Sequence, residues 1–277
     1  MIPIDFSYYR PDTLQEAYGL FDELTKQGKS VVYYSGGSEI ITIARKGSIK
    51  PDAVIDLKAI GECGNMQFLG EQLYIGSCVT LTRIAESQCF PFLGTTEGRV
   101  ADHTNQCRIT IGGNICGTII YKETLLPMLL SDSKVVVYGA GGQREVGIGE
   151  VFKEKLLLGH GEFIVGFLVY KQNLALPYVH IKKTKNEKID YPLISFGANV
   201  KEGRLRIAFS GLCAFPFRSV EIENTLNNTN TSLEDRVDKI TTHLPAPVLD
   251  NLSGSAEYRL FVLKNTVVNI MYRLGVL

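Results

Sequence analysis

The 277-residue sequence has no tryptophan, only four histidines and no net charge, because 29 Lys and Arg residues balance 29 Asp and Glu residues. A protein that acts mainly on nucleic acid or anionic lipid carries a positive excess, so the balance argues against both classes. The histidines form neither an i,i+4 pair nor an HExxH motif, which argues against a metal site. No G-x-S-x-G motif occurs, so no nucleophile elbow is indicated.

Cysteine pairs and long apolar runs are also missing. The six cysteines contain no C-x-x-C pair, which argues against a disulfide framework and against zinc or iron–sulfur sites. Free thiols are typical of a reducing cytoplasm, so we predict a cytoplasmic protein. The first residues, Met1–Asp5, lack the basic and apolar regions of a signal peptide. The most apolar stretch, Leu156–Tyr170, is broken by His160, Glu162 and three glycines, so it is not expected to span a membrane.

Glycine, in contrast, is abundant and unevenly placed. Residues 1–170 contain 22 of the 27 glycines, and residues 171–277 contain five. Tight turns and close backbone approaches are therefore expected mainly in the first part. Hydrophobic periodicity and turn residues predict the following elements: helices over 12–27, 40–46, 80–87, 124–131, 217–227, 232–243 and 255–274, strands over 30–34, 54–57, 73–76, 134–138, 144–146, 163–170, 192–200 and 204–211, and a glycine loop over 112–117.

One glycine cluster, Gly139-Ala140-Gly141-Gly142, follows a predicted strand and invites comparison with a dinucleotide-binding turn. That fingerprint requires glycine or alanine at position 144, where Arg144 stands, and a helix that opens there. The sequence instead continues in an extended pattern. We therefore predict a hairpin turn.

Two other glycine pairs lie in different parts of the chain. Ser35-Gly36-Gly37-Ser38-Glu39 connects a buried strand to a helix, and uncovered amides at a helix N-terminus suit a diphosphate. Thr110-Ile111-Gly112-Gly113-Asn114-Ile115 is expected to expose its backbone in the same way. Two such pairs are consistent with a nucleotide held from both sides, and two unrelated turns are the alternative.

Six ordered motifs give the chain a family resemblance along nearly its whole length. The sequence resembles the FAD-binding medium subunit, or FAD domain, of the xanthine dehydrogenase and carbon monoxide dehydrogenase family of molybdenum hydroxylases. The most specific motif is Arg108–Ile115, which matches the family's second FAD loop. The other matching motifs are Phe6–Pro11, Tyr34–Ile41, Pro51–Leu57, Ile75–Leu81 and Leu252–Arg259.

The resemblance implies an α+β protein. Residues 1–58 and 59–175 would form a two-subdomain FAD-binding fold of the vanillyl-alcohol-oxidase type. Residues 176–277 would form a C-terminal domain with an antiparallel sheet and helices, like that of the carbon monoxide dehydrogenase flavoprotein. No catalytic or metal-binding residue is implied. The implied FAD contacts are Tyr33, Tyr34, Ser35, Gly36, Gly37, Ser38, Glu39, Ile40, Val100, Thr110, Ile111, Gly112, Gly113, Asn114, Glu123, Ile164 and Lys182.

The resemblance also implies a function in electron transfer. Electrons would come from the [2Fe-2S] clusters of a small partner subunit, after a molybdopterin-binding large subunit has oxidised the substrate, and would pass from FAD to an acceptor such as NAD+. Lys182 would be a cation near the flavin, where it favours a negatively charged reduced form. A stand-alone FAD-dependent oxidoreductase and a nucleotide-binding module without redox role are the alternatives.

The sequence departs from the family pattern between Asn114 and Glu123. The expected Ser-Pro is missing, and Glu123 stands where the family usually has aspartate. This segment borders the flavin in the family, so the departure leaves the electron acceptor open. Both glycine motifs are intact, and FAD binding is still expected.

Overall fold

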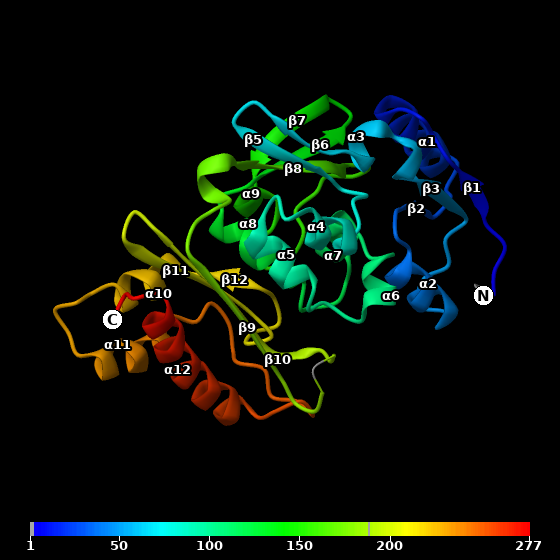
Figure 1. The fold of residues 1–277 in the computed structure, drawn as a ribbon. Helices are drawn as coiled ribbons and strands as arrows, with labels where there is room; N and C mark the ends of the chain where they lie inside the picture. The colour runs from blue at the N-terminus through cyan, green and yellow to red at the C-terminus, as the bar shows by residue number, and fades with distance from the viewer. Residues whose placement is uncertain (1–2, 188) are drawn as a thin grey trace.

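The computed structural model describes residues 3–187 and 189–277, so Met1, Ile2 and Lys188 lie outside the described residues. Three sheets follow one another along the chain (Figure 1). Most strand pairs are antiparallel, and helices pack beside each sheet. Within the described residues, no helix combines the length and the apolar composition needed to cross a bilayer.

The first sheet is parallel, with strand order β1-β3-β2. The predicted helix over 12–27 is confirmed as α1, since the Thr13 hydroxyl accepts a hydrogen bond from the Glu16 amide and Gly28 follows the last turn. The elements of this part are β1 (Ser7–Tyr9), α1 (Leu14–Lys26), β2 (Val31–Tyr34), α2 (Ser38–Arg45) and β3 (Ala53–Asp56).

The second sheet is antiparallel, with strand order β4-β5-β8-β6-β7. Gly139 pairs with Gly142 at the end of the β6–β7 hairpin, which confirms the predicted turn. The elements of this part are η1 (Leu57–Ala59), α3 (Gly61–Gly64), β4 (Met66–Leu69), β5 (Gln72–Gly76), α4 (Leu81–Ser87), α5 (Pro91–Glu97), α6 (His103–Gln106), α7 (Ile111–Cys116), α8 (Leu125–Leu130), β6 (Lys134–Gly139), β7 (Gly142–Gly147), α9 (Ile148–Val151), β8 (Phe163–Tyr170) and η2 (Lys171–Asn173).

The third sheet is antiparallel, with strand order β12-β11-β10-β9. Its β10–β11 hairpin turns at Glu202-Gly203, as predicted. The prediction that a helix starts at 217 is wrong, because Phe217–Arg218 pairs with β11 as β12. The elements are β9 (Tyr178–Thr184), β10 (Pro192–Lys201), β11 (Arg204–Ser210), β12 (Phe217–Arg218), α10 (Val220–Leu226), α11 (Leu233–Lys239), η3 (Ile240–His243) and α12 (Ala256–Arg273).

The predicted glycine loop over 112–117 is a second error, because residues 111–116 form helix α7. The Thr110 hydroxyl caps this helix by accepting a hydrogen bond from the Gly113 amide. Ile111 and Ile115, four residues apart, are both fully buried in the core beside the second sheet. A cap and two buried side chains on one face therefore outweigh the low helix propensity of two glycines.

Helix α8 (Leu125–Leu130) is packed between the second and third sheets. It packs against β10 and β11, and Figure 1 shows it between the two sheets. One apolar core joins the first sheet to one face of the second, a second core lies on the other face of the second sheet, and a third lies beside the third sheet.

Candidate functional site

A cleft of about 920 Å³ collects residues from the first sheet, helices α2 and α7, strand β8 and strand β9. All but one of the cofactor contacts implied by the sequence line this cleft. The exception is Ile111, which is fully buried in the core. The cleft therefore brings together side chains and backbone that lie far apart in the sequence.

The first wall of the cleft is the connection from β2 to α2, residues 35–40. Gly37 precedes the helix with a φ of 71°, a left-handed conformation that disfavours a side chain. Among the described residues, the backbone amides of residues 36–40 donate to no protein acceptor. First-turn amides point out of a helix N-terminus, where the helix dipole adds partial positive charge. This wall therefore suits an anionic group such as a diphosphate.

The second wall is Thr110–Asn114, and its backbone is largely occupied. The amide of Ile111 donates to the Val79 carbonyl at 3.0 Å, and that of Gly112 to the Ser77 carbonyl at 2.9 Å. The Gly113 amide donates to the Thr110 hydroxyl at 3.2 Å. The expectation that this pair exposes its amides is therefore wrong, because the cap and a neighbouring segment already accept from them.

The two walls touch each other directly. The Ser35 hydroxyl donates to the Thr110 hydroxyl at 3.1 Å. A Cβ atom on Gly36 would collide with the backbone of Arg108, and one on Gly112 would lie 2.7 Å from the Ser77 Cβ. The glycines at 36 and 112 thus permit close backbone packing. Gly113, in contrast, is exposed on the cleft side.

Two buried polar atoms of the cleft lining have no hydrogen-bond partner within the described residues. They are the Ser77 hydroxyl oxygen and the Asn114 side-chain oxygen. Buried polar groups are normally paired, so these two atoms retain unused hydrogen-bonding capacity at the lining of the cleft. The sequence predicted Asn114 as a contact but not Ser77, although Ser77 lies within the matching motif Ile75–Leu81.

The rest of the lining is largely apolar and was also missed. Flat aromatic ring systems suit such surfaces. Buried strands predict burial without telling which side chains border a cavity, so no sequence signal marked these positions. The apolar lining residues that sequence reasoning missed include Val32, Ile43, Ile49, Leu57, Leu156, Leu158 and Phe163.

At one end of the cleft, Glu123 and Lys182 form an ion pair. Their charged atoms are 2.9 Å apart, and each side chain is only 5% exposed. The Ser195 hydroxyl donates to Glu123, and the Lys182 ammonium donates to the Arg99 carbonyl at 2.8 Å. Burial raises the pKa of Glu123, while Lys182 opposes this effect. The charge of Lys182, predicted as a cation near the cofactor, is therefore balanced by a carboxylate.

The divergent segment over 116–123 is fastened to the first wall. The Glu39 carboxylate accepts hydrogen bonds from the Thr118 amide, at 2.5 Å, and from the Thr118 hydroxyl. Lys122 donates to carbonyls at the end of α7. Tyr121 stacks on Tyr191 with ring centroids 5.1 Å apart, and both line the cleft. The segment thus closes this side of the cleft without the Ser-Pro that the family resemblance led us to expect.

Comparison of the chain with known proteins identifies related sequences. Residues 4–169 match a family model described as the FAD binding domain in molybdopterin dehydrogenase. The chain is 24% identical over 280 residues to the xanthine dehydrogenase FAD-binding subunit of Escherichia coli O157:H7, covering 96% of this chain and 94% of that protein. It is 24% identical over 209 residues to the nicotinate dehydrogenase FAD-subunit of Eubacterium barkeri, covering 71% and 69%.

The fold is similar to that of a solved oxidoreductase chain. A chain of carbon monoxide dehydrogenase from Hydrogenophaga pseudoflava superposes with a TM-score of 0.86 at 21% identity, and the match covers 99% of both chains. The α+β fold expected from the sequence, with a two-subdomain part followed by an antiparallel sheet and helices, is therefore confirmed.

Proposed function

The chain belongs to the family described as the FAD binding domain in molybdopterin dehydrogenase, and from this premise we propose that the cleft holds FAD with its diphosphate against residues 36–40. The chain is the FAD-binding subunit of a molybdenum hydroxylase-type dehydrogenase, and FAD is its cofactor. The observation that carries this assignment is that five amides without a protein acceptor and two orphaned polar atoms all belong to residues that line one cleft.

The residues of the cleft suit the parts of FAD in different ways. The amides of residues 36–40 donate to phosphate oxygens, and the exposed Gly113 lets the cofactor approach the second wall. The Ser77 hydroxyl and the Asn114 side chain gain the partners that they lack. The apolar lining of β2, α2 and β8 packs against the rings. In this proposal, each of these groups of cleft residues contacts a particular part of FAD.

The proposed role is electron transfer. FAD, when bound, accepts electrons and passes them on singly or in pairs. This chain positions the cofactor, and its Glu123–Lys182 ion pair keeps the charge balanced at that part of the cleft. Electron transfer requires no general acid or base, and we assign none to this chain. The electrons would come from the [2Fe-2S] clusters of a small subunit, and a molybdopterin-binding large subunit would oxidise the substrate. The names of the relatives, which are subunits or chains of dehydrogenases, support this division.

Three earlier expectations stay predictions. NAD+ as the electron acceptor rests on the family resemblance, and a cytoplasmic location rests on the free thiols expected from the cysteine spacing. The three-domain division at residues 58 and 175 is supported by the placement of one sheet in each part.

The two alternative functions make different demands. A stand-alone oxidoreductase would need its own substrate site, and a redox-inactive nucleotide module would bind ADP as well as FAD.

The purified full-length chain provides the test of this function. We expect it to show a flavin spectrum, to bind FAD more tightly than ADP, and to co-purify with molybdenum and iron–sulfur subunits when expressed with its neighbours. A chain that binds no FAD would overturn the proposal. A chain that oxidises a small organic substrate efficiently by itself would instead support the stand-alone enzyme.

A further inference from the structure

A second carboxyl group lies buried behind the Glu123–Lys182 pair. Glu97 ends helix α5, is 0% exposed and does not line the cleft. Its Oε2 accepts a hydrogen bond from the Thr124 hydroxyl at 3.3 Å, and Thr124 directly follows Glu123. Its Oε1 has no partner within the described residues. Glu97 therefore has one long hydrogen bond, whereas Glu123 has Lys182 and Ser195.

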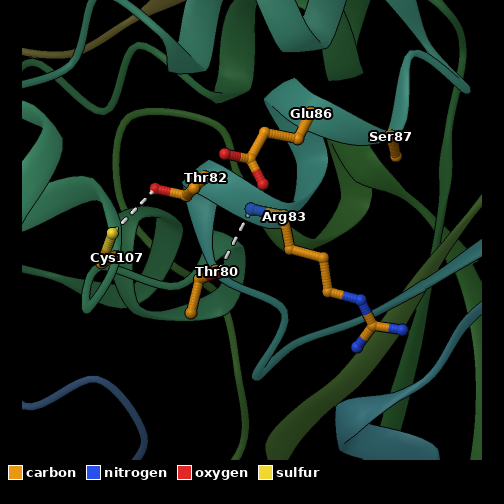
Figure 2. A pocket seen from close by; sticks show the side chains of 6 residues that line it. All are labelled: Thr80, Thr82, Arg83, Glu86, Ser87 and Cys107. Carbon is orange, nitrogen blue, oxygen red and sulfur yellow. Dashed lines mark hydrogen bonds between the residues drawn. The ribbon is translucent and has the colours of Figure 1, made fainter.

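The charged groups of the neighbouring elements leave Glu97 without a cation. On β9, Lys182 is engaged by Glu123 and the Arg99 carbonyl. Arg99 itself donates to the His180 carbonyl at 3.1 Å, and Tyr178 hydrogen-bonds Thr95 at 2.8 Å. Figure 2 shows Arg83 and Glu86 of α4 lining a separate pocket, and both are exposed. Among the residues that the structure describes, no lysine, arginine or histidine side chain therefore forms an ion pair with Glu97.

An isolated carboxyl in such surroundings keeps its proton. Burial raises the pKa of Glu97 to about 8, and the nearby Glu123 charge adds to the rise. Burial also lowers the pKa of His180 to about 3, so this imidazole is neutral at pH 7. The two buried carboxyls are thus distinguished by their partners, because a carboxylate is stabilised by an ammonium and by hydroxyl donors.

We propose that Glu97 is a positioning residue that stays protonated while Glu123 stays ionised, so that the Glu123–Lys182 end of the cleft carries no net charge. Ionisation of Glu97 would place an uncompensated negative charge behind Glu123. The proposal concerns the chain itself, and only its consequence for FAD rests on the proposed function.

The consequence for FAD is electrostatic. Electron uptake adds negative charge at the cofactor, and a second carboxylate near Glu123 opposes this addition. While Glu97 is protonated, Lys182 and Glu123 cancel each other and electron uptake meets no such repulsion. The reduction potential of bound FAD is therefore expected to fall more steeply with pH in the wild type than in Glu97→Gln as Glu97 ionises.

Thermal unfolding against pH provides the test and needs no FAD. Because the folded-state pKa of Glu97 lies above the unfolded value, the wild type loses stability as pH rises from the ordinary Glu range toward pH 8. Glu97→Gln imitates the protonated acid and escapes this loss. We expect its Tm to match the wild type near about pH 5 and to exceed it increasingly up to about pH 9. Glu86→Gln, an exposed change on α4, is the control and should show a constant difference.

Identical pH profiles for the wild type and Glu97→Gln would overturn the proposal. Infrared spectroscopy of the wild type supplies a second measurement that does not depend on any variant folding. We expect the C=O stretch of a protonated carboxylic acid at pH 7, and its absence would also overturn the proposal. For the FAD-loaded chain, the reduction potential of Glu97→Gln should equal that of the wild type at pH 6 and exceed it at pH 9. Failure to bind FAD would affect only this last readout.

Discussion

Helices α2 and α7 both begin beside a Gly-Gly pair, and both pairs line one cleft. Before α2, the amides of residues 36–40 have no protein acceptor among the described residues. At α7, the amides of residues 111–113 are taken by Val79, Ser77 and Thr110. The backbone amides of the first wall are therefore free to donate to a ligand, whereas those of residues 111–113 in the second wall already donate to acceptors of the protein.

This difference shows that a glycine pair has two separate uses. At Gly37 the backbone needs a left-handed conformation and leaves amides uncovered. At Gly112 the missing side chain lets α7 pack on Ser77. Sequence alone does not separate these uses, because both require only that a Cβ be absent. Substitutions in the two walls should therefore affect stability and FAD affinity to different extents.

The largest effect is expected from Gly36→Ala, at the point where the walls touch. A Cβ here would collide with the Arg108 carbonyl group, which is backbone and cannot rotate away. We expect a loss of about 1–3 kcal/mol in the free energy of unfolding, together with loss of FAD binding. Chemical denaturation and FAD titration measure both. Wild-type values for stability and affinity would show that the walls do not approach as described.

Gly113→Val should separate affinity from stability. Gly113 is exposed, and an added Cβ would meet only the Thr110 hydroxyl oxygen, at 2.9 Å. The valine side chain would occupy space at the cleft wall, so we expect FAD affinity to fall about 100-fold or more, or about 2.7 kcal/mol, with a near-wild-type Tm. Gly141→Ala is the control, since its Cβ would meet nothing within 4 Å. Equal FAD occupancy in both variants would refute the placement of FAD against this wall.

A smaller change is expected from Thr110→Val, which keeps the side-chain shape. It removes the cap of α7 and the acceptor of the Ser35 hydroxyl. Loss of an N-cap costs about 1 kcal/mol, and the freed Gly113 amide becomes available to a ligand. We expect lower stability by denaturation with less than a tenfold change in FAD affinity. A much larger loss of affinity than of stability would mean that Thr110 contacts FAD directly.

The smallest effect is expected from Ser77→Ala. The Ser77 hydroxyl has no partner among the described residues, so its removal should leave the FAD-free chain equally stable or slightly more stable. FAD should bind about 2- to 12-fold more weakly, which corresponds to about 0.5–1.5 kcal/mol for one hydrogen bond. Calorimetry of FAD binding checks the affinity. Unchanged affinity would remove Ser77 from the proposed contacts.

Much of the fold follows from local patterns in the sequence. Strand β8, both hairpin turns and helix α12 were predicted because apolar periodicity and turn residues mark them. Strand β9 was missed because its polar residues, Lys182 and Lys183 among them, conceal an edge strand. Helix α7 was missed because its two glycines lower the helix propensity of the segment. The Thr110 cap and the burial of Ile111 and Ile115, which stabilise the helix, become visible only in the folded chain.

The site was predicted through its glycines and the family resemblance, and the physical roles came from the structure. Whether an amide is free depends on Ser77 and Val79, which reach α7 only in the folded chain. The orphaned Ser77 hydroxyl and the buried Glu97 carboxyl also have no local signal, because burial without a partner is a property of packing. Sequence patterns therefore predict which segments line the cleft more readily than they predict which backbone amides are free to donate to a ligand.

Amide hydrogen exchange, resolved by residue with NMR, tests the contrast between the two walls most directly. In the FAD-free chain we expect fast exchange at residues 36–40 and protection at residues 111–113. FAD should slow exchange at residues 36–40 at least about tenfold, which corresponds to about 1.4 kcal/mol, and leave residues 111–113 nearly unchanged. Protection that appears at residues 111–113 while residues 36–40 keep exchanging fast would contradict the account.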